Sequence, residues 1–141
     1  MAASKGFEFR YRECGKAPTI LDFLCKDTET LTKGDLGNLE TGEIDLAATA
    51  DTGLLGAIME TASGTDSTTR FKVIVDADAV YAVYDANARL VGACLDISGA
   101  TANQTVASKT NADLVVVAES SADEETLVKI HPTQHWQYAA A

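Results

Sequence analysis

A pattern of short apolar runs broken by turn residues covers most of the sequence after residue 31, and it limits the possible folds more than any other feature. The runs at 71–75, 80–84 and 114–117 are rich in Val, with Phe or Tyr in some of them, and these residues favour strands. Gly, Asp, Asn, Ser and Thr separate the runs, and turn signals recur about every 8–12 residues. This spacing predicts a mainly β chain that forms a small β-barrel or β-sandwich, similar to a β-tulip.

The stretches 33–75 and 88–131 follow the same order of features. Each begins with a strand that contains Gly and Leu, continues through a turn to an apolar run that ends in an acid, and closes on another strand. The similarity predicts two related halves that complete one barrel or sandwich. It also favours a strand over a helix at 54–60, because the matching run at 114–118 has the character of a strand. In addition, interior glycines such as Gly56 cost a helix about 1 kcal/mol each.

The first residues differ from the rest of the chain in charge. Residues 1–16 carry a net charge of +2 and residues 17–141 carry −12, which together make the total of −10. Within the first segment, Phe7, Phe9 and Tyr11 alternate with charged side chains. Alternation with a period of two predicts a half-buried strand over 7–12.

The Gly and Pro of residues 14–18 end this pattern. The apolar residues that follow predict a short helical turn over 19–26. We therefore divide the chain into an N-terminal arm at 1–31, a β-rich body at 32–131 and a C-terminal tail at 132–141.

Length, charge and cysteine content exclude several classes of protein. The 141 residues correspond to one domain, and the acidic charge argues against binding to nucleic acid phosphates. No apolar run approaches the roughly 18 residues of a membrane span, and the first residues lack the apolar region of a secretory signal. Cys14, Cys25 and Cys94 form an odd, widely spaced set, so we expect free thiols in a reducing compartment.

The sequence offers little chemistry for catalysis or metal binding. His131 and His135 have the spacing of a helical zinc pair, but Pro132 lies between them and no further ligand is near in sequence. Asp76 and Asp78 resemble the start of a calcium loop whose remaining ligands are missing. No nucleophile motif or phosphate-binding loop occurs. We expect no enzyme activity, no cofactor and no metal.

The two ends of the chain carry the candidate contact residues. Aromatic side chains with a polar group are enriched at protein interfaces, and the arm also suits addition to the edge of a partner's sheet. The alternative is that both ends pack against their own body. The hypothesis names as partner-binding residues Phe7, Phe9, Arg10, Tyr11, Arg12, Trp136 and Tyr138.

The runs 33–43 (KGDLGNLETGE) and 54–60 (LLGAIME) resemble small capsid decoration, or cement, proteins of tailed bacteriophages. The resemblance covers about residues 32–131 and rests on the order of strands and turns. It implies a virion protein that is made in the host cytoplasm and located on the outer capsid surface. The implied partners are the major capsid protein and further copies of the chain, commonly as a homotrimer, with terminal arms that grip the shell.

A different class of function also fits a small β protein, namely a soluble β-barrel module that binds a ligand or carbohydrate. A binding pocket of that kind uses several aromatic side chains. Residues 32–131 contain only Phe71, Tyr81 and Tyr84. This scarcity favours the structural protein over the binding module.

Overall fold

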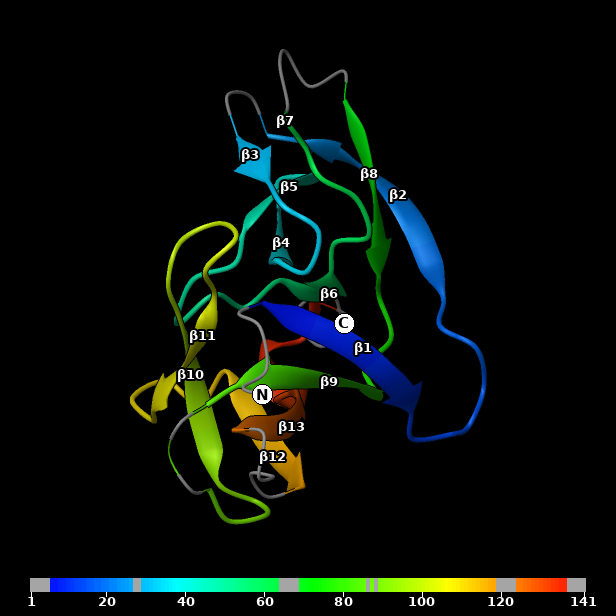
Figure 1. Cartoon of the computed structure of the whole chain (residues 1–141). Coiled ribbons are helices and arrows are strands. Elements are labelled where there is room, and N and C mark those ends of the chain that lie inside the picture. The colour runs from blue at the N-terminus through cyan, green and yellow to red at the C-terminus, as the bar shows by residue number, and fades with distance from the viewer. Residues whose placement is uncertain are drawn as a thin grey trace.

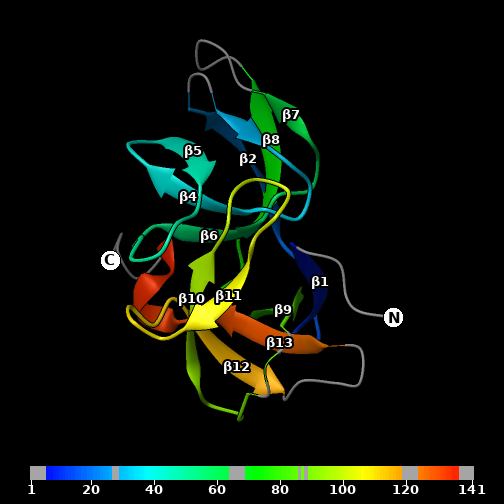
Figure 2. The ribbon, with the colours of Figure 1, turned by 60° about the vertical axis from the view of Figure 1, so that its left-hand side comes forward.

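The computed structural model describes residues 6–26, 29–63, 69–85, 87, 89–118 and 124–136. Figures 1 and 2 show two sheets, one in the upper and one in the lower half of the molecule. The lower sheet contains β1 (Phe7–Arg12), β9 (Ala79–Tyr84), β10 (Cys94–Ser98), β11 (Thr105–Ser108), β12 (Leu114–Ala118) and β13 (Glu125–Ile130). The upper sheet contains β2 (Ile20–Cys25), β4 (Leu36–Glu40), β5 (Glu43–Leu46), β6 (Leu54–Ala57) and β8 (Arg70–Ile74).

The short strands β3 (Thr30–Leu31) and β7 (Ala62–Ser63) form a separate pair, and a 3₁₀ turn covers Pro132–Gln134. No helix in the described part of the chain is long and apolar enough to cross a membrane. The prediction of a mainly β chain is confirmed. The arrangement is a sandwich of two sheets rather than a closed barrel.

Each of the two similar sequence stretches supplies four strands to one sheet: 33–75 contains β4, β5, β6 and β8, and 88–131 contains β10, β11, β12 and β13. In the six-stranded sheet, β9 pairs with β13, β13 with β12, β12 with β10, and β10 with β11. In the five-stranded sheet, β2 pairs with β8 and β6 pairs with β4, which pairs with β5. A bridge between Ile58 and Val73 joins β8 to the end of β6. The same order of five strands therefore occurs twice, which agrees with the similarity of the two sequence stretches.

The two five-strand units differ at the seam between their first strand (β2 or β9) and their third strand (β5 or β11). In the five-stranded sheet, β2 and β5 pair directly in parallel. In the six-stranded sheet, β1 pairs with β9, and Gly6 N donates a hydrogen bond of 2.8 Å to Gln104 O, just before β11. The N-terminal strand thus reaches both sides of the second seam.

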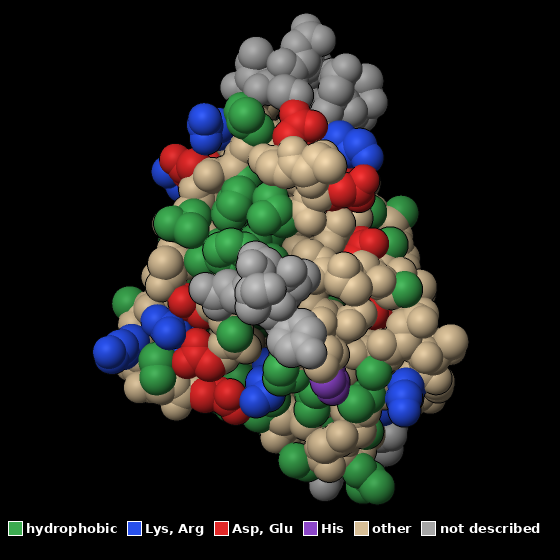
Figure 3. All heavy atoms as spheres, turned by 180° about the vertical axis from the view of Figure 1, so that it is seen from behind, with side chains coloured by type: hydrophobic (Ala, Val, Ile, Leu, Met, Phe, Trp, Pro, Cys, Tyr) green, Lys and Arg blue, Asp and Glu red, His purple; other side chains and the backbone are tan. Residues whose placement is uncertain are grey.

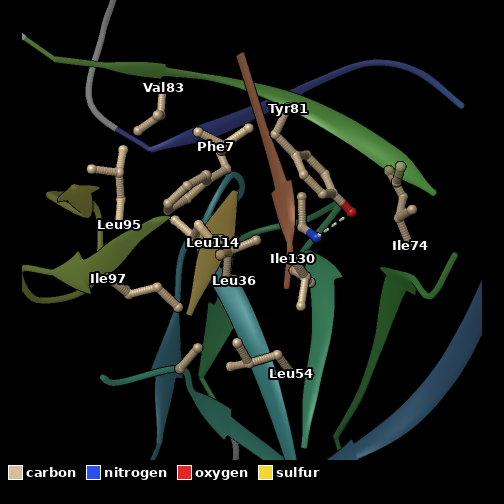
Figure 4. Close-up of a cluster of buried hydrophobic side chains, with 14 of the residues drawn as sticks. Phe7, Leu36, Leu54, Ile74, Tyr81, Val83, Leu95, Ile97, Leu114 and Ile130 are labelled. Atoms are coloured by element: carbon tan, nitrogen blue, oxygen red, sulfur yellow. Dashed lines mark hydrogen bonds between the residues drawn. The ribbon is translucent and has the colours of Figure 1, made fainter. Parts of the chain in front are cut away.

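A cluster of buried hydrophobic side chains lies between the sheets (Figure 4). Leu36, Leu54 and Ile74 come from the upper sheet and meet side chains of the lower sheet such as Tyr81 and Leu114. A second cluster is formed by residues of the five-stranded sheet and its connections, namely Cys25, Leu31, Ile44, Leu55, Ile58, Phe71, Val73 and Val75. The two clusters share β6, because Leu54 belongs to the first and Leu55 to the second.

The backbone at Gly56 makes this sharing possible. The register between β4 and β6 shifts at this point, as in a β-bulge, so that Leu54 and Ala57 face the same cluster. A Cβ atom at Gly56 would lie 2.1 Å from Ile74 O and 2.4 Å from Tyr81 Oη. Only glycine fits such a close approach of two backbones. The predicted strand at 54–60 is confirmed over Leu54–Ala57.

Two predictions for the first 31 residues need correction. Ile20–Cys25 is a strand rather than a helical turn, because Leu21 and Phe23 pair with Val73 and Phe71 across β8. The strand predicted at 7–12 is confirmed, but it does not extend away from the body as an arm. Phe7 is only 2% exposed and lies in the cluster between the sheets.

Candidate partner-binding surfaces

The aromatic side chains of β1 divide between the core and the surface. The rings of Phe7 and Phe9 approach Tyr81 edge-on, with centroid distances of 6.4 Å and 6.2 Å. Tyr11, in contrast, is 42% exposed. The structure therefore places Phe7 inside this chain and leaves Tyr11 as the aromatic side chain of the strand that a partner can reach.

The arginines of β1 already have acidic partners within the chain. Arg10 Nη2 lies 2.6 Å from Glu125 Oε2, and Arg10 Nε lies 3.0 Å from Glu8 Oε1. Arg12 Nε donates to Asp78 Oδ1 at 2.8 Å, and its Nη1 lies 3.5 Å from Asp76. The sequence hypothesis assigned these arginines to contacts with a partner, whereas the structure pairs them with acids of their own chain.

The outer edge of β1 is poorly suited to pairing with a further strand. β1 ends the six-stranded sheet, and its register is interrupted between Phe9 and Tyr11. Bulges and charged side chains are the devices by which edge strands avoid additional pairing. β1 carries both, and these features argue against the predicted addition of this strand to a partner's sheet.

The C-terminal segment also packs against its own chain. Trp136 Nε1 donates to Val75 O at 3.1 Å, and the indole meets Phe23 edge-on at 6.4 Å between centroids. His135 is buried, its Nε2 lies 3.0 Å from the same carbonyl oxygen, and burial lowers its pKa. Tyr138 lies outside the described residues. Among the described residues of the two ends, Phe7 and Trp136 pack against the chain's own body, as the alternative predicted, whereas Tyr11 is exposed.

Neither candidate metal motif gathers ligands. His131 Nδ1 accepts a hydrogen bond from Thr133 N at 3.2 Å, and His135 faces Val75 O instead. Asp76 and Asp78 bind Thr19 N and the Arg12 side chain. In the parts of the chain that the structure describes, no three His, Cys, Asp or Glu side chains lie together as a metal site would require.

Buried polar side chains that the sequence did not single out hold the loops. Gln104 is fully buried, accepts from Leu36 N at 2.7 Å and donates to Ala47 O at 2.9 Å, so it fastens the β10–β11 connection to the upper sheet. Asp35 accepts from Thr32 N within its own loop and from Ala102 N across the same boundary. Asp96 accepts from Thr110 N and Asn111 N, and Asp113 accepts from Ala50 N in a loop and from Ile97 N in β10. Asp beside turn residues is the only sequence signal for this role.

A few large hydrophobic side chains remain exposed. Ile20 and Leu21 on β2 are 42% and 43% exposed, and Figure 3 shows hydrophobic side chains gathered over the upper part of the rear face. Leu90 and Val91, in the turn between β9 and β10, are exposed more strongly still. The sequence around these four residues does not indicate which apolar side chains are buried and which are exposed.

Comparison with known proteins gives a likeness of fold. No protein-family model and no curated protein matches the sequence. Among solved structures, the chain is similar to the N base of the head fiber protein gp8.5 of bacteriophage phi29, with a TM-score of 0.51 and 16% sequence identity. The similarity covers 82% of this chain and 97% of that chain. At this identity it establishes a shared fold.

Proposed function

We propose that this chain is a virion structural protein of a tailed bacteriophage, and that it acts as a capsid decoration protein. In this role it binds the outer surface of the major capsid protein shell and stabilises that shell by binding, without catalysis. The observation that carries the proposal is the likeness of fold to a phage head fiber base, which spans nearly the whole of that base. The order of strands and turns in the sequence supports the same class of protein.

The construction of the molecule suits a stabilising clamp. Both sheets contribute to one buried cluster, and buried Gln104 ties the β10–β11 connection to the upper sheet. A protein that binds the assembled shell and not its free subunits stabilises the shell by RT ln(1 + [L]/Kd), or about 2.7 kcal/mol at 100 times Kd. The stabilisation from each bound chain adds to that of the other symmetry-related copies on the same particle. A homotrimer is the form we propose, since closed symmetry is usual for identical subunits that meet a symmetric surface.

The test compares phage heads with and without the chain. Heads are purified from a phage in which its gene is deleted, and recombinant protein is added back. We expect the protein to co-sediment with the heads and to raise the fraction that survives heating or osmotic shock. Heads treated with heat-denatured protein serve as the control. Equal survival with no co-sedimentation would contradict the proposal and favour a soluble ligand-binding module.

A further inference from the structure

The face of β2 that points to the second cluster, its inner face, carries apolar side chains that the described residues leave partly uncovered. Leu21 lies opposite Val73 of β8, and Phe23 lies opposite Phe71. Directly paired residues point to the same face of a sheet, so all four side chains face the second cluster. Val73 and Phe71 are fully buried, whereas Leu21 is 43% exposed and Phe23 is only partly buried. The second cluster is therefore open on one side, and Figure 3 shows hydrophobic side chains at the surface of the upper rear face.

The last described residue, Trp136, is held beside this face. Its Nε1 donates to Val75 O at 3.1 Å, and its indole meets Phe23 edge-on at 6.4 Å between centroids. Val75 N in turn donates to Thr19 O at 3.1 Å, just before β2 begins. Trp136 therefore lies beside the first half of β2, where Leu21 is exposed.

Contacts of the two preceding residues fix the course of the chain up to this point. Gln134 Nε2 donates to Asp51 O at 3.1 Å. His135 forms a parallel bridge with Leu54 of β6, and its side chain is only 2% exposed. The residues after Trp136 therefore start from a fixed position beside β2, which limits the surface that they can reach.

The length and composition of the following segment suit this face. Residues 137–141 read Gln-Tyr-Ala-Ala-Ala and contain no charged side chain. An extended chain spans at most about 3.6 Å per residue, so five residues reach about 17 Å. Leu21 and Phe23 are two residues apart on one strand, or about 7 Å. The segment is long enough to cover both, and a tyrosine ring buries a large apolar area while its hydroxyl stays in water.

We propose that residues 137–141 lie along the inner face of β2, where Tyr138 and the alanines after it cover Leu21 and Phe23. The C-terminal segment then closes the open side of the second cluster. A segment tethered at Trp136 meets this face at an effective concentration in the millimolar range, so a second copy or another protein in solution must compete with it. Tyr138, a partner-binding residue in the sequence hypothesis, thereby takes a place within its own chain. The contact is internal, so it does not depend on binding to a phage head.

Disulfide trapping in the full chain tests the position of the segment. Leu21→Cys and Tyr138→Cys are combined with Cys14→Ser, which removes the exposed native thiol. Bonded cysteines have Cα atoms about 4.4–6.8 Å apart, and the proposed contact brings these two positions within that range. With diamide as the oxidant, we therefore expect most chains of this variant to form an intramolecular disulfide between positions 21 and 138.

The matched control joins Tyr138→Cys and Cys14→Ser with Leu90→Cys, at a leucine that is 74% exposed in the turn between β9 and β10. Peptide mapping by mass spectrometry identifies the bonded cysteines, and we expect no bond between positions 90 and 138. Absence of the intramolecular bond between positions 21 and 138 overturns the inference. A bond between two chains assigns the face to a second copy and overturns it as well. Equal bonding at positions 21 and 90 has the same consequence, because the segment is then not held at β2.

A chain that ends at Trp136 supplies an independent readout. Trp136 is the only tryptophan and lies beside the proposed contact, so loss of the cover should shift its fluorescence emission to longer wavelength. The newly exposed apolar surface should also raise binding of the dye ANS several-fold relative to the full chain. Unchanged emission together with unchanged ANS binding would show that residues 137–141 do not cover this face, and would overturn the inference.

Discussion

At Asp78, immediately before β9, donors from the N-terminal segment converge on one carboxylate. Arg12 Nε lies 2.8 Å from Oδ1, and Cys14 N lies 3.2 Å from Oδ2. Partial burial raises the pKa of Asp78, but the hydrogen bonds from Arg12 and Cys14 outweigh burial and lower the pKa to about 2. The carboxylate thus fixes the end of β1 to the start of β9.

A pH-dependent stability difference follows at this residue. The folded pKa of Asp78 lies below the ordinary value of 3.8, so its stabilisation is complete above about pH 4 and is lost as the pH falls towards 2. The substitution Arg12→Gln removes the main cause of this shift. We expect it to lower the melting temperature at pH 7, and we expect the gap from the wild type to close between pH 4 and pH 2.

The exposed pair of Lys72 and Asp22 provides the control for this experiment. Its atoms lie 3.3 Å apart, but both side chains are more than half exposed. Exposed ion pairs contribute little to stability, so Lys72→Gln should follow the wild type over the whole pH range. A gap for Arg12→Gln that stays constant down to pH 2 would show that Asp78 does not cause it.

At the scale of elements, β1 is a structural part of the sandwich. It pairs with β9 from Phe7 to Arg12, and Phe7 contributes to the cluster between the sheets. The sequence analysis placed residues 1–16 in an N-terminal arm outside the β-rich body, so their removal would leave the body folded. The structure indicates instead that their removal strips a side chain from the core and uncovers the edge of β9.

Two substitutions on the same strand test this structural role. Phe7→Ala should lower the free energy of unfolding by about 3–5 kcal/mol, because it removes a buried aromatic ring and leaves a cavity. Tyr11→Ala, at a side chain that is 42% exposed, should change it by less than about 1 kcal/mol. Urea unfolding followed by circular dichroism measures both. A change of less than about 1 kcal/mol in the free energy of unfolding for Phe7→Ala would indicate that β1 is a detachable arm.

At the scale of the whole molecule, the shared cluster couples the two sheets. Leu114 of β12 packs in one cluster with Leu36, Leu54 and Ile74 of the upper sheet. Trp136, the only tryptophan, packs against the second cluster, which lies within the upper sheet. Unfolding that begins in the lower sheet can therefore be followed by the fluorescence of Trp136 in the upper half.

This coupling predicts a single unfolding transition for the chain. Leu114→Ala should lower the free energy of unfolding by about 2–5 kcal/mol. Trp136 fluorescence and far-ultraviolet circular dichroism should shift together, since loss of the shared cluster exposes both sheets. Leu90→Ala, at an exposed leucine in the turn between β9 and β10, is the control with little expected effect. Separate transitions by the two probes would show that the sheets unfold independently.

Much of the fold could be predicted because strand formation leaves a local record. Alternation at 7–12 and the apolar runs at 71–75, 80–84 and 114–117 correspond to strands. The similarity of the two halves anticipated the repeated strand order. These features depend on neighbours within a few residues, so they can be read without knowledge of distant contacts.

The tertiary structure alone decided which surfaces remain free. Ile20–Cys25 is a strand because Phe71 and Val73 lie beside it, and a short apolar run contains no sign of partners so far along the chain. Phe7 and Trp136 were predicted to contact a partner, but in the structure Phe7 packs against Tyr81, and Trp136 packs against Phe23 and donates to Val75 O. Conversely, no local pattern marks Leu90 and Val91 as exposed. Strand formation follows from local alternation and turn chemistry, whereas exposure depends on which distant residues pack on each side chain, and that is determined only when the sheets assemble.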